Sequence, residues 1–99
     1  MATVSYAPRA FADLEKLRDF LAESDPHAAV RTIDLIVDAV AILEQHPLMG
    51  RPAEADLREL VISRGKSGYL ALYRYDGERD RVLVLAIRHQ REAGYLGFS

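Results

Sequence analysis

The spacing of apolar residues in this chain changes once, from a helical repeat to a strand repeat, at residues 46–52 (HPLMGRP). Before this segment, apolar residues recur every three or four positions along residues 8–23 and 26–45, which predicts two amphipathic helices. After it, apolar residues alternate with polar ones or form short runs, which predicts strands. The segment itself holds two prolines and a glycine, and therefore predicts a loop. This order indicates helices packed on a sheet.

The helix boundaries follow from local chemistry. Pro8 suits the first turn of a helix, where its missing N–H costs nothing. A second start follows at Asp25, a good N-cap, with Pro26 in the first helical position. His46 precedes Pro47 and is therefore pushed out of helical geometry, which ends the second helix. Because so few residues join the two helices, we expect an antiparallel hairpin.

The strand predictions complete the fold. The last segment is apolar on both faces, which is typical of a central strand covered on both sides. Asp76 and Gly77 predict a tight hairpin turn before it. The order β-α-α-β-β-β predicts one α+β domain over residues 1–99, with a helix hairpin on a small, mainly antiparallel sheet. The segments predicted as strands are residues 4–6, 57–62, 69–75 and 81–88.

The composition argues against several kinds of protein and of functional site. The chain has no cysteine, which excludes disulfides, thiolate zinc sites and cysteine nucleophiles. His27, His46 and His89 lie in three different elements without ligand spacing, so we predict no metal site, and no motif predicts a cofactor. No window approaches about 18 consecutive apolar residues, so we expect no membrane span. Residues 1–6 lack the features of a secretory signal, which makes the cytoplasm the expected location.

Charge and apolar surface both suggest a partner. The net charge is −2, but residues 1–56 carry five basic against ten acidic side chains, and residues 57–99 carry eight against five. This asymmetry indicates either a second half that faces an anionic or acidic partner, or chance scatter. On the second helix, Leu35, Ala39 and Ile42 widen the apolar stripe beyond the core face. A stripe this wide indicates either deep burial or a surface that a partner covers. The predicted core face consists of Ile33, Ile36, Val37, Val40 and Leu43.

Several segments, taken in order, resemble the RelE/ParE toxins of bacterial type II toxin–antitoxin systems. Residues 6–29 (YAPRAFADLEKLRDFLAESDPHAA) look like the first helix hairpin of ParE-type toxins, and HPLMGRP resembles their helix-to-sheet turn. LREL (57–60), GYLALYRY (68–75) and VLVLAIRHQREAGY (82–95) resemble the strands and short tail. The resemblance spans residues 5–95 in the right order and spacing.

The resemblance implies a toxin that a cognate antitoxin holds inactive in a hetero-oligomer. In ParE-like members the antitoxin is usually a ribbon-helix-helix DNA-binding protein, and here its contacts would include Leu35, Ala39 and Ile42. RelE-like members cut messenger RNA in the ribosome, whereas ParE-like members inhibit DNA gyrase without a known catalytic reaction. A third possibility is a non-toxic relic that still binds an antitoxin. Fold alone does not decide among these mechanisms.

RNA cleavage through the 2′-OH needs an acid, a base and cations against the phosphate. By resemblance, Arg64 and Arg88 would hold phosphate, and His89 and Tyr95 would act as acid or base. Each also has a structural interpretation: a capping histidine, a packed tyrosine ring, or arginines paired with carboxylates such as Glu59. The residues predicted to contact either target are Arg58, Arg64, Lys66, Arg74, Arg88 and Arg91.

Two further observations bear on the target. Tyr69, Tyr73 and Tyr75 share one parity, and would either stack bases if exposed or pack within the sheet. The sequence pI is about 5.9. Nucleases that dock on the ribosome tend to be strongly basic, because phosphate contacts dominate their affinity. The charge therefore favours gyrase as the target over messenger RNA.

Overall fold

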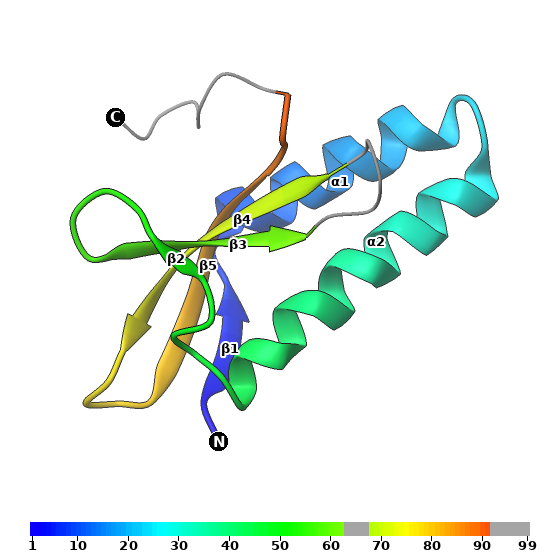
Figure 1. Cartoon of the computed structure of the whole chain (residues 1–99). Coiled ribbons are helices and arrows are strands. Elements are labelled where there is room, and N and C mark those ends of the chain that lie inside the picture. Colours follow the sequence, from blue (N-terminus) through cyan, green and yellow to red (C-terminus); the bar gives the residue numbers. More distant parts are fainter. Residues whose placement is uncertain (63–67, 92–99) are drawn as a thin grey trace.

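The computed structural model describes residues 1–62 and 68–91, in which two helices lie along one face of a five-stranded sheet (Figure 1). The predicted order β-α-α-β-β-β is confirmed, with one addition: a two-residue strand, β2, inside the segment predicted as a loop. The elements are β1 (Thr3–Tyr6), α1 (Pro8–Ala22), α2 (Pro26–Ala41), the 3-10 turn η1 (Ile42–Glu44), β2 (Arg51–Pro52), β3 (Leu57–Ile62), β4 (Tyr69–Asp76) and β5 (Arg81–His89).

The sheet has the strand order β1-β5-β4-β3-β2. β1 pairs in parallel with β5. The helix hairpin leads from β1 to β2 at the opposite edge of the sheet, and the three strands that follow bring the chain back beside β1. The other neighbouring strands pair antiparallel, as short connections require. β5 is therefore an interior strand, as its apolar sequence predicts.

Both helices begin where the sequence predicts. Asp25 Oδ1 accepts hydrogen bonds from the backbone N–H groups of His27 at 3.0 Å and Ala28 at 3.2 Å, which makes it the N-cap of α2. Pro8 and Pro26 occupy the first turns of α1 and α2. The second helix is shorter than predicted, because the α-helix ends at Ala41 and its last turn tightens into η1.

The core lies between the helices and the sheet. Four of the five residues predicted to form the core face of α2 do face it: Ile36, Val40 and Leu43 are fully buried, and Ile33 packs against them. Val37 was wrongly placed there, since it is 41% exposed. The sheet contributes Leu60, Ile62, Tyr69, Ala71, Tyr73, Val82, Val84 and Ile87 to this core.

The β4–β5 turn spans residues 77–80. Asp76 Oδ1 accepts from the backbone N–H groups of Glu78 at 3.1 Å and Arg79 at 3.3 Å, which organises the turn. Asp80 closes it in the left-handed region, with φ 52°. The aspartate–glycine signal therefore predicts the position of the turn.

Candidate functional site

The face of the sheet that points away from the helices carries part of the predicted site, and we call it the outer face. Successive side chains of a strand point to opposite faces. Since Leu60, Tyr69 and Ala71 belong to the helix-side core, their neighbours Glu59 and Leu70 point outward. The register places Glu59 beside Leu72, Leu72 beside Ala86, and Leu70 beside Arg88.

The centre of the outer face is apolar and holds one carboxylate. Leu70 and Leu72 are each 3% exposed, and Ala86 is fully buried. Glu59, at 9% exposure, is the buried charged residue among those that the structure describes. The middle of this face therefore holds little positive charge.

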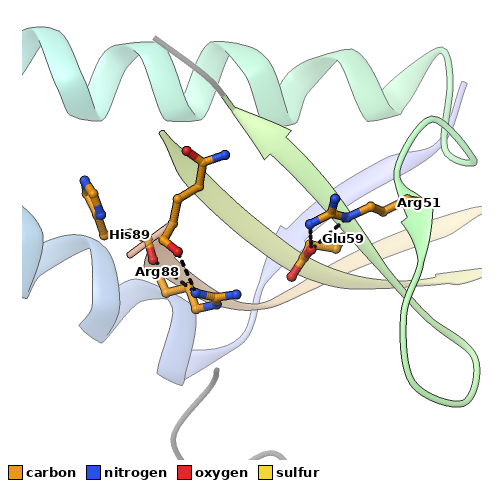
Figure 2. Close-up of polar contacts among 5 residues, drawn as sticks. Arg51, Glu59, Arg88 and His89 are labelled. Atoms are coloured by element: carbon orange, nitrogen blue, oxygen red, sulfur yellow. Dashed lines mark hydrogen bonds and ion pairs between the residues drawn. The ribbon is translucent and has the colours of Figure 1, made fainter. Parts of the chain in front are cut away.

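Glu59 is paired with Arg51 (Figure 2). The Arg51 Nε donates to Glu59 Oε1 at 2.9 Å, and its Nη2 donates to the same oxygen. β2 makes this contact possible, because its pairing with β3 sets Arg51 opposite Glu59. An arginine of the sheet face paired with Glu59 was one of the interpretations left open by the sequence, which gives no signal for Arg51 because that residue lies in the predicted loop.

Arg88 and His89 lie together at the end of β5, in a different part of the sheet from the Arg51–Glu59 pair (Figure 2). Arg88 Nη1 donates to the carbonyl of His89 at 3.2 Å and to that of Gln90 at 3.5 Å. His89 Nδ1 accepts the backbone N–H of Arg91 at 3.0 Å. Nδ1 is therefore the acceptor nitrogen of the ring here, and in the neutral ring Nε2 carries the proton.

The two side chains leave the strand toward opposite faces. The register sets Arg88 beside the outward Leu70, whereas it sets His89 beside the inward Tyr69. The His89 ring meets the Tyr69 ring edge-on, with 5.3 Å between centroids. Together with the bond from the Arg91 N–H, this contact supports the interpretation of His89 as a capping histidine at a strand end.

Two more of the predicted target contacts lie on the strands, Arg58 on β3 and Arg74 on β4. Arg58 Nη1 donates to the carbonyls of Leu48 at 3.2 Å and Gly50 at 2.8 Å, so it braces the loop between η1 and β2. Arg74 lies 3.2 Å from an Asp56 carboxylate oxygen. Three predicted residues, Arg64, Lys66 and Tyr95, lie outside the described residues.

The tyrosines pack instead of forming a stacking surface. Tyr69 is 5% exposed and Tyr73 is fully buried, both within the helix-side core. Tyr75 is partly buried against the same core. Burial raises the pKa of Tyr69 and of Tyr73 above the usual value. The packing interpretation of these rings is therefore the one that the structure supports.

The apolar stripe of α2 divides into a covered part and an open part. Leu35 and Ala39 are partly buried against the core, whereas Ile42 is 45% exposed. Val30, at 59% exposure, is a further open apolar residue that the core pattern did not single out. Burial against the core therefore accounts in part for the apolar character of Leu35 and Ala39. Of the three predicted antitoxin contacts, Ile42 has the most accessible side chain.

No group of histidine, cysteine, aspartate or glutamate side chains among residues 1–62 and 68–91 is arranged to hold a metal ion. Within the same residues, neither helix has the length and apolar character needed to cross a bilayer.

Comparison with known proteins gives consistent matches over most of the chain. The family model for the ParE toxin of the type II toxin–antitoxin system parDE matches residues 4–94. Toxin RelE3 of Caulobacter vibrioides is 42% identical over 92 residues, covering 93% of this chain and 98% of that protein. Toxin RelE2 of the same organism is 42% identical over 62 residues, covering 63% of this chain and 70% of that protein.

Solved structures share the fold. A chain of the chromosomal ParDE toxin–antitoxin system from P. aeruginosa has a TM-score of 0.75 and 27% identity, covering 90% of this chain and 96% of that one. A chain of the RelBE2 toxin–antitoxin complex from Mycobacterium tuberculosis has a TM-score of 0.63 and 29% identity, covering 90% and 98%. This chain therefore belongs to the ParE toxin family of type II toxin–antitoxin systems, within the RelE/ParE superfamily.

Proposed function

We propose that this toxin stops growth by binding DNA gyrase and does not cut RNA. The observation that carries the proposal is the chemistry of the outer face. A nuclease would need cations there to stabilise the crowded phosphate of the transition state. Instead, the centre of the face consists of Leu70, Leu72 and Ala86, beside the buried carboxylate of Glu59.

The contacts of the surrounding arginines support the same conclusion. Arg51 is held by Glu59, and Arg74 by Asp56. Arg58 is turned to loop carbonyls. A phosphate would have to compete with these contacts, and the carboxylate of Glu59 would repel it. A sequence pI of about 5.9 adds no general attraction for nucleic acid.

Ribosome-dependent cleavage of messenger RNA is the second candidate. It is favoured by the relatives named RelE, of which RelE3 is 42% identical to this chain. In that case, His89 would act as acid or base and Arg88 would contact the phosphate. Both residues sit at the end of β5, where their side chains are half-buried.

The gyrase proposal is tested with the purified full chain in a supercoiling assay. We expect supercoiling by gyrase to fall as the chain is added, and to recover when its antitoxin is added. A relaxing topoisomerase assayed in parallel should be unaffected, which controls for general interference with DNA. A preparation that arrests growth on expression but leaves gyrase fully active would contradict the proposal.

We also propose that a cognate ribbon-helix-helix antitoxin neutralises this chain in a hetero-oligomer. The support is the family membership, together with the ParDE and RelBE2 structures, which are toxin–antitoxin systems. The test expresses the chain with and without the neighbouring open reading frame. We expect growth arrest only without it, and co-purification of the two products. Arrest that the neighbouring product does not relieve would remove it as the antitoxin.

A further inference from the structure

Strand β5 extends beyond the end of its neighbour β1. The pairing of the two strands ends at Tyr6 and Val84, and the Ala7 N–H donates to the Val84 carbonyl at 2.8 Å as the chain leaves the sheet for α1. The register with β4 shifts at Leu85, which forms a β-bulge without a partner in β4. From this bulge to His89, in the part of the sheet that the structure describes, β5 pairs with β4 on one side and with no strand on the other.

A carboxylate of α1 occupies the side of β5 that β1 leaves. Successive backbone N–H groups of an antiparallel strand point to alternate sides. The Gln90 N–H donates to the Gly68 carbonyl at 2.9 Å, just before β4 begins, so the Ile87 N–H three residues earlier points away from β4. Asp13 Oδ2 accepts this N–H at 2.9 Å. Helix α1 thus supplies the acceptor that a longer β1 would have supplied.

The Asp13 carboxylate is held in this place by its surroundings. Its side chain is 18% exposed, and the Arg9 Nε lies 3.7 Å from the same Oδ2, one turn earlier on α1. α1 packs against β5 (Figure 1), and the side chain of Ile87 belongs to the core between the helices and the sheet. A hydrogen bond to a carboxylate is shorter and stronger than one between neutral groups. The contact therefore fixes the backbone of β5 at Ile87.

Arg88 follows Ile87 and depends on the same piece of backbone. Its Nη1 donates to the carbonyls of His89 and Gln90, so the guanidinium lies along the chain at the end of β5 (Figure 2). A shift of the backbone at Ile87 would move both carbonyls, and the guanidinium with them. This segment is held by β4 from one side and by Asp13 from the other.

We propose that Asp13 is a positioning residue, which acts through the Ile87 N–H to hold the guanidinium of Arg88 for contact with the target of the toxin. The inference rests on the proposed function in so far as the chain acts by binding a macromolecular target, whichever target that is. A side chain that is held in its binding position before the target arrives loses less entropy on binding, and therefore binds more tightly. The competing explanation is that Asp13 only stabilises the fold.

A double-mutant cycle with Asp13→Ala and Arg88→Ala separates positioning from stability. Potency is measured as the amount of full chain, quantified by immunoblot, that arrests growth on controlled expression. Each single variant should lower potency roughly tenfold, as expected for a lost hydrogen bond to a charged group. In the Arg88→Ala background, Asp13→Ala should lower potency no further, because the guanidinium that Asp13 positions is absent. The Tm should fall with Asp13→Ala in both backgrounds.

Two further variants on α1 serve as controls. Asp13→Asn keeps an oxygen that can accept the Ile87 N–H, and should therefore retain potency. Asp19→Ala removes a carboxylate that is 73% exposed and pairs with Arg18, so it should change neither potency nor Tm. If Asp13→Ala does not fold, Asp13→Glu takes its place in the cycle, since the longer side chain displaces the acceptor and keeps the charge.

The proposal is overturned if Asp13→Ala lowers potency equally in both backgrounds, since Asp13 would then act through stability alone. Wild-type potency in either single variant, or a loss in Asp13→Asn as large as that in Asp13→Ala, would overturn it as well. A failure of the gyrase proposal is distinguishable, because the wild-type chain would then arrest growth while gyrase supercoiling stayed unaffected.

Discussion

The hydroxyl of Tyr73 and the backbone of Gly50 are joined by a buried hydrogen bond, in which the Gly50 N–H donates to Tyr73 Oη at 2.8 Å. The same hydroxyl donates to the Pro47 carbonyl at 2.8 Å. One tyrosine of the central sheet thus fixes the loop that leads from the helices to β2. Arg51 follows Gly50 directly and lies opposite Glu59. The Tyr73–Gly50 hydrogen bond therefore also helps to set the Arg51–Glu59 pair on the outer face.

Tyr73→Phe should lower the free energy of unfolding by about 1–3 kcal/mol, because the buried Gly50 N–H loses its acceptor. Denaturant unfolding of the purified chain measures this change. Tyr75→Phe is the matched control, since the Tyr75 hydroxyl bonds only to the half-exposed Asp80 among the described residues. Its loss should be clearly smaller. Equal losses in the two variants would show that the Tyr73–Gly50 bond does not hold the loop.

Gly50→Ala tests how closely the tyrosine ring approaches the loop. An added Cβ would lie 2.6 Å from both Cε1 and Oη of Tyr73, and 3.0 Å from the Glu59 carbonyl oxygen. Such overpacking should cost about 1–3 kcal/mol of stability. At Gly77, in contrast, the nearest atom to an added Cβ is Tyr75 Cε2 at 3.7 Å. The control Gly77→Ala should therefore leave the denaturation midpoint nearly unchanged. If Gly50→Ala had wild-type stability, the close approach of the Tyr73 ring to the loop would be refuted.

Stability should fall at alkaline pH because of the buried tyrosines. Burial raises the pKa of Tyr73, and this effect exceeds the lowering by the Gly50 N–H and by Arg58. A raised folded-state pKa gives stability that is complete below the unfolded value of about 10, and is lost as pH rises through the folded value. The free energy of unfolding should therefore decline as the pH rises above about 10, and decline less steeply in Tyr73→Phe. Identical slopes for the two proteins would contradict this origin.

Ile42→Glu should weaken antitoxin binding roughly tenfold or more, while changing stability by no more than about 0.5 kcal/mol, because Ile42 is 45% exposed. Isothermal titration with the antitoxin gives the affinity, and thermal unfolding gives the stability. Leu35→Glu provides the comparison: Leu35 packs against the core, so this variant should also lose stability. Unchanged affinity in Ile42→Glu would remove that residue from the antitoxin surface.

The sequence predicts those parts of the fold that depend on neighbouring residues. Pro8, Asp25 and Pro26 mark the helix starts, because capping and proline geometry act within one turn. Val37 was misplaced because a helical repeat gives only the approximate direction of the apolar face. The exact exposure of Val37 depends on how α2 rests on α1 and the sheet, which is a tertiary property.

The candidate site was less predictable, because it depends on strand register. Arg58 and Glu59 are adjacent in sequence, yet one braces the loop and the other lies on the outer face. The partner of Glu59 is Arg51 in β2. This strand is only two residues long, so it has no alternating pattern from which the sequence could predict it. Likewise, Arg88 and His89 look like one cluster in the sequence, but their side chains leave β5 toward opposite faces.

The most direct test of the central claim is the integrity of ribosome-bound messenger RNA, measured by primer extension after adding the purified chain. If the chain is not a nuclease, the message stays whole while the same preparation inhibits gyrase supercoiling and arrests growth on expression. His89→Gln should then leave growth arrest largely unchanged. Cuts at codon spacing would contradict the account, above all if His89→Gln slowed them by the hundred- to ten-thousand-fold typical of a lost general acid or base.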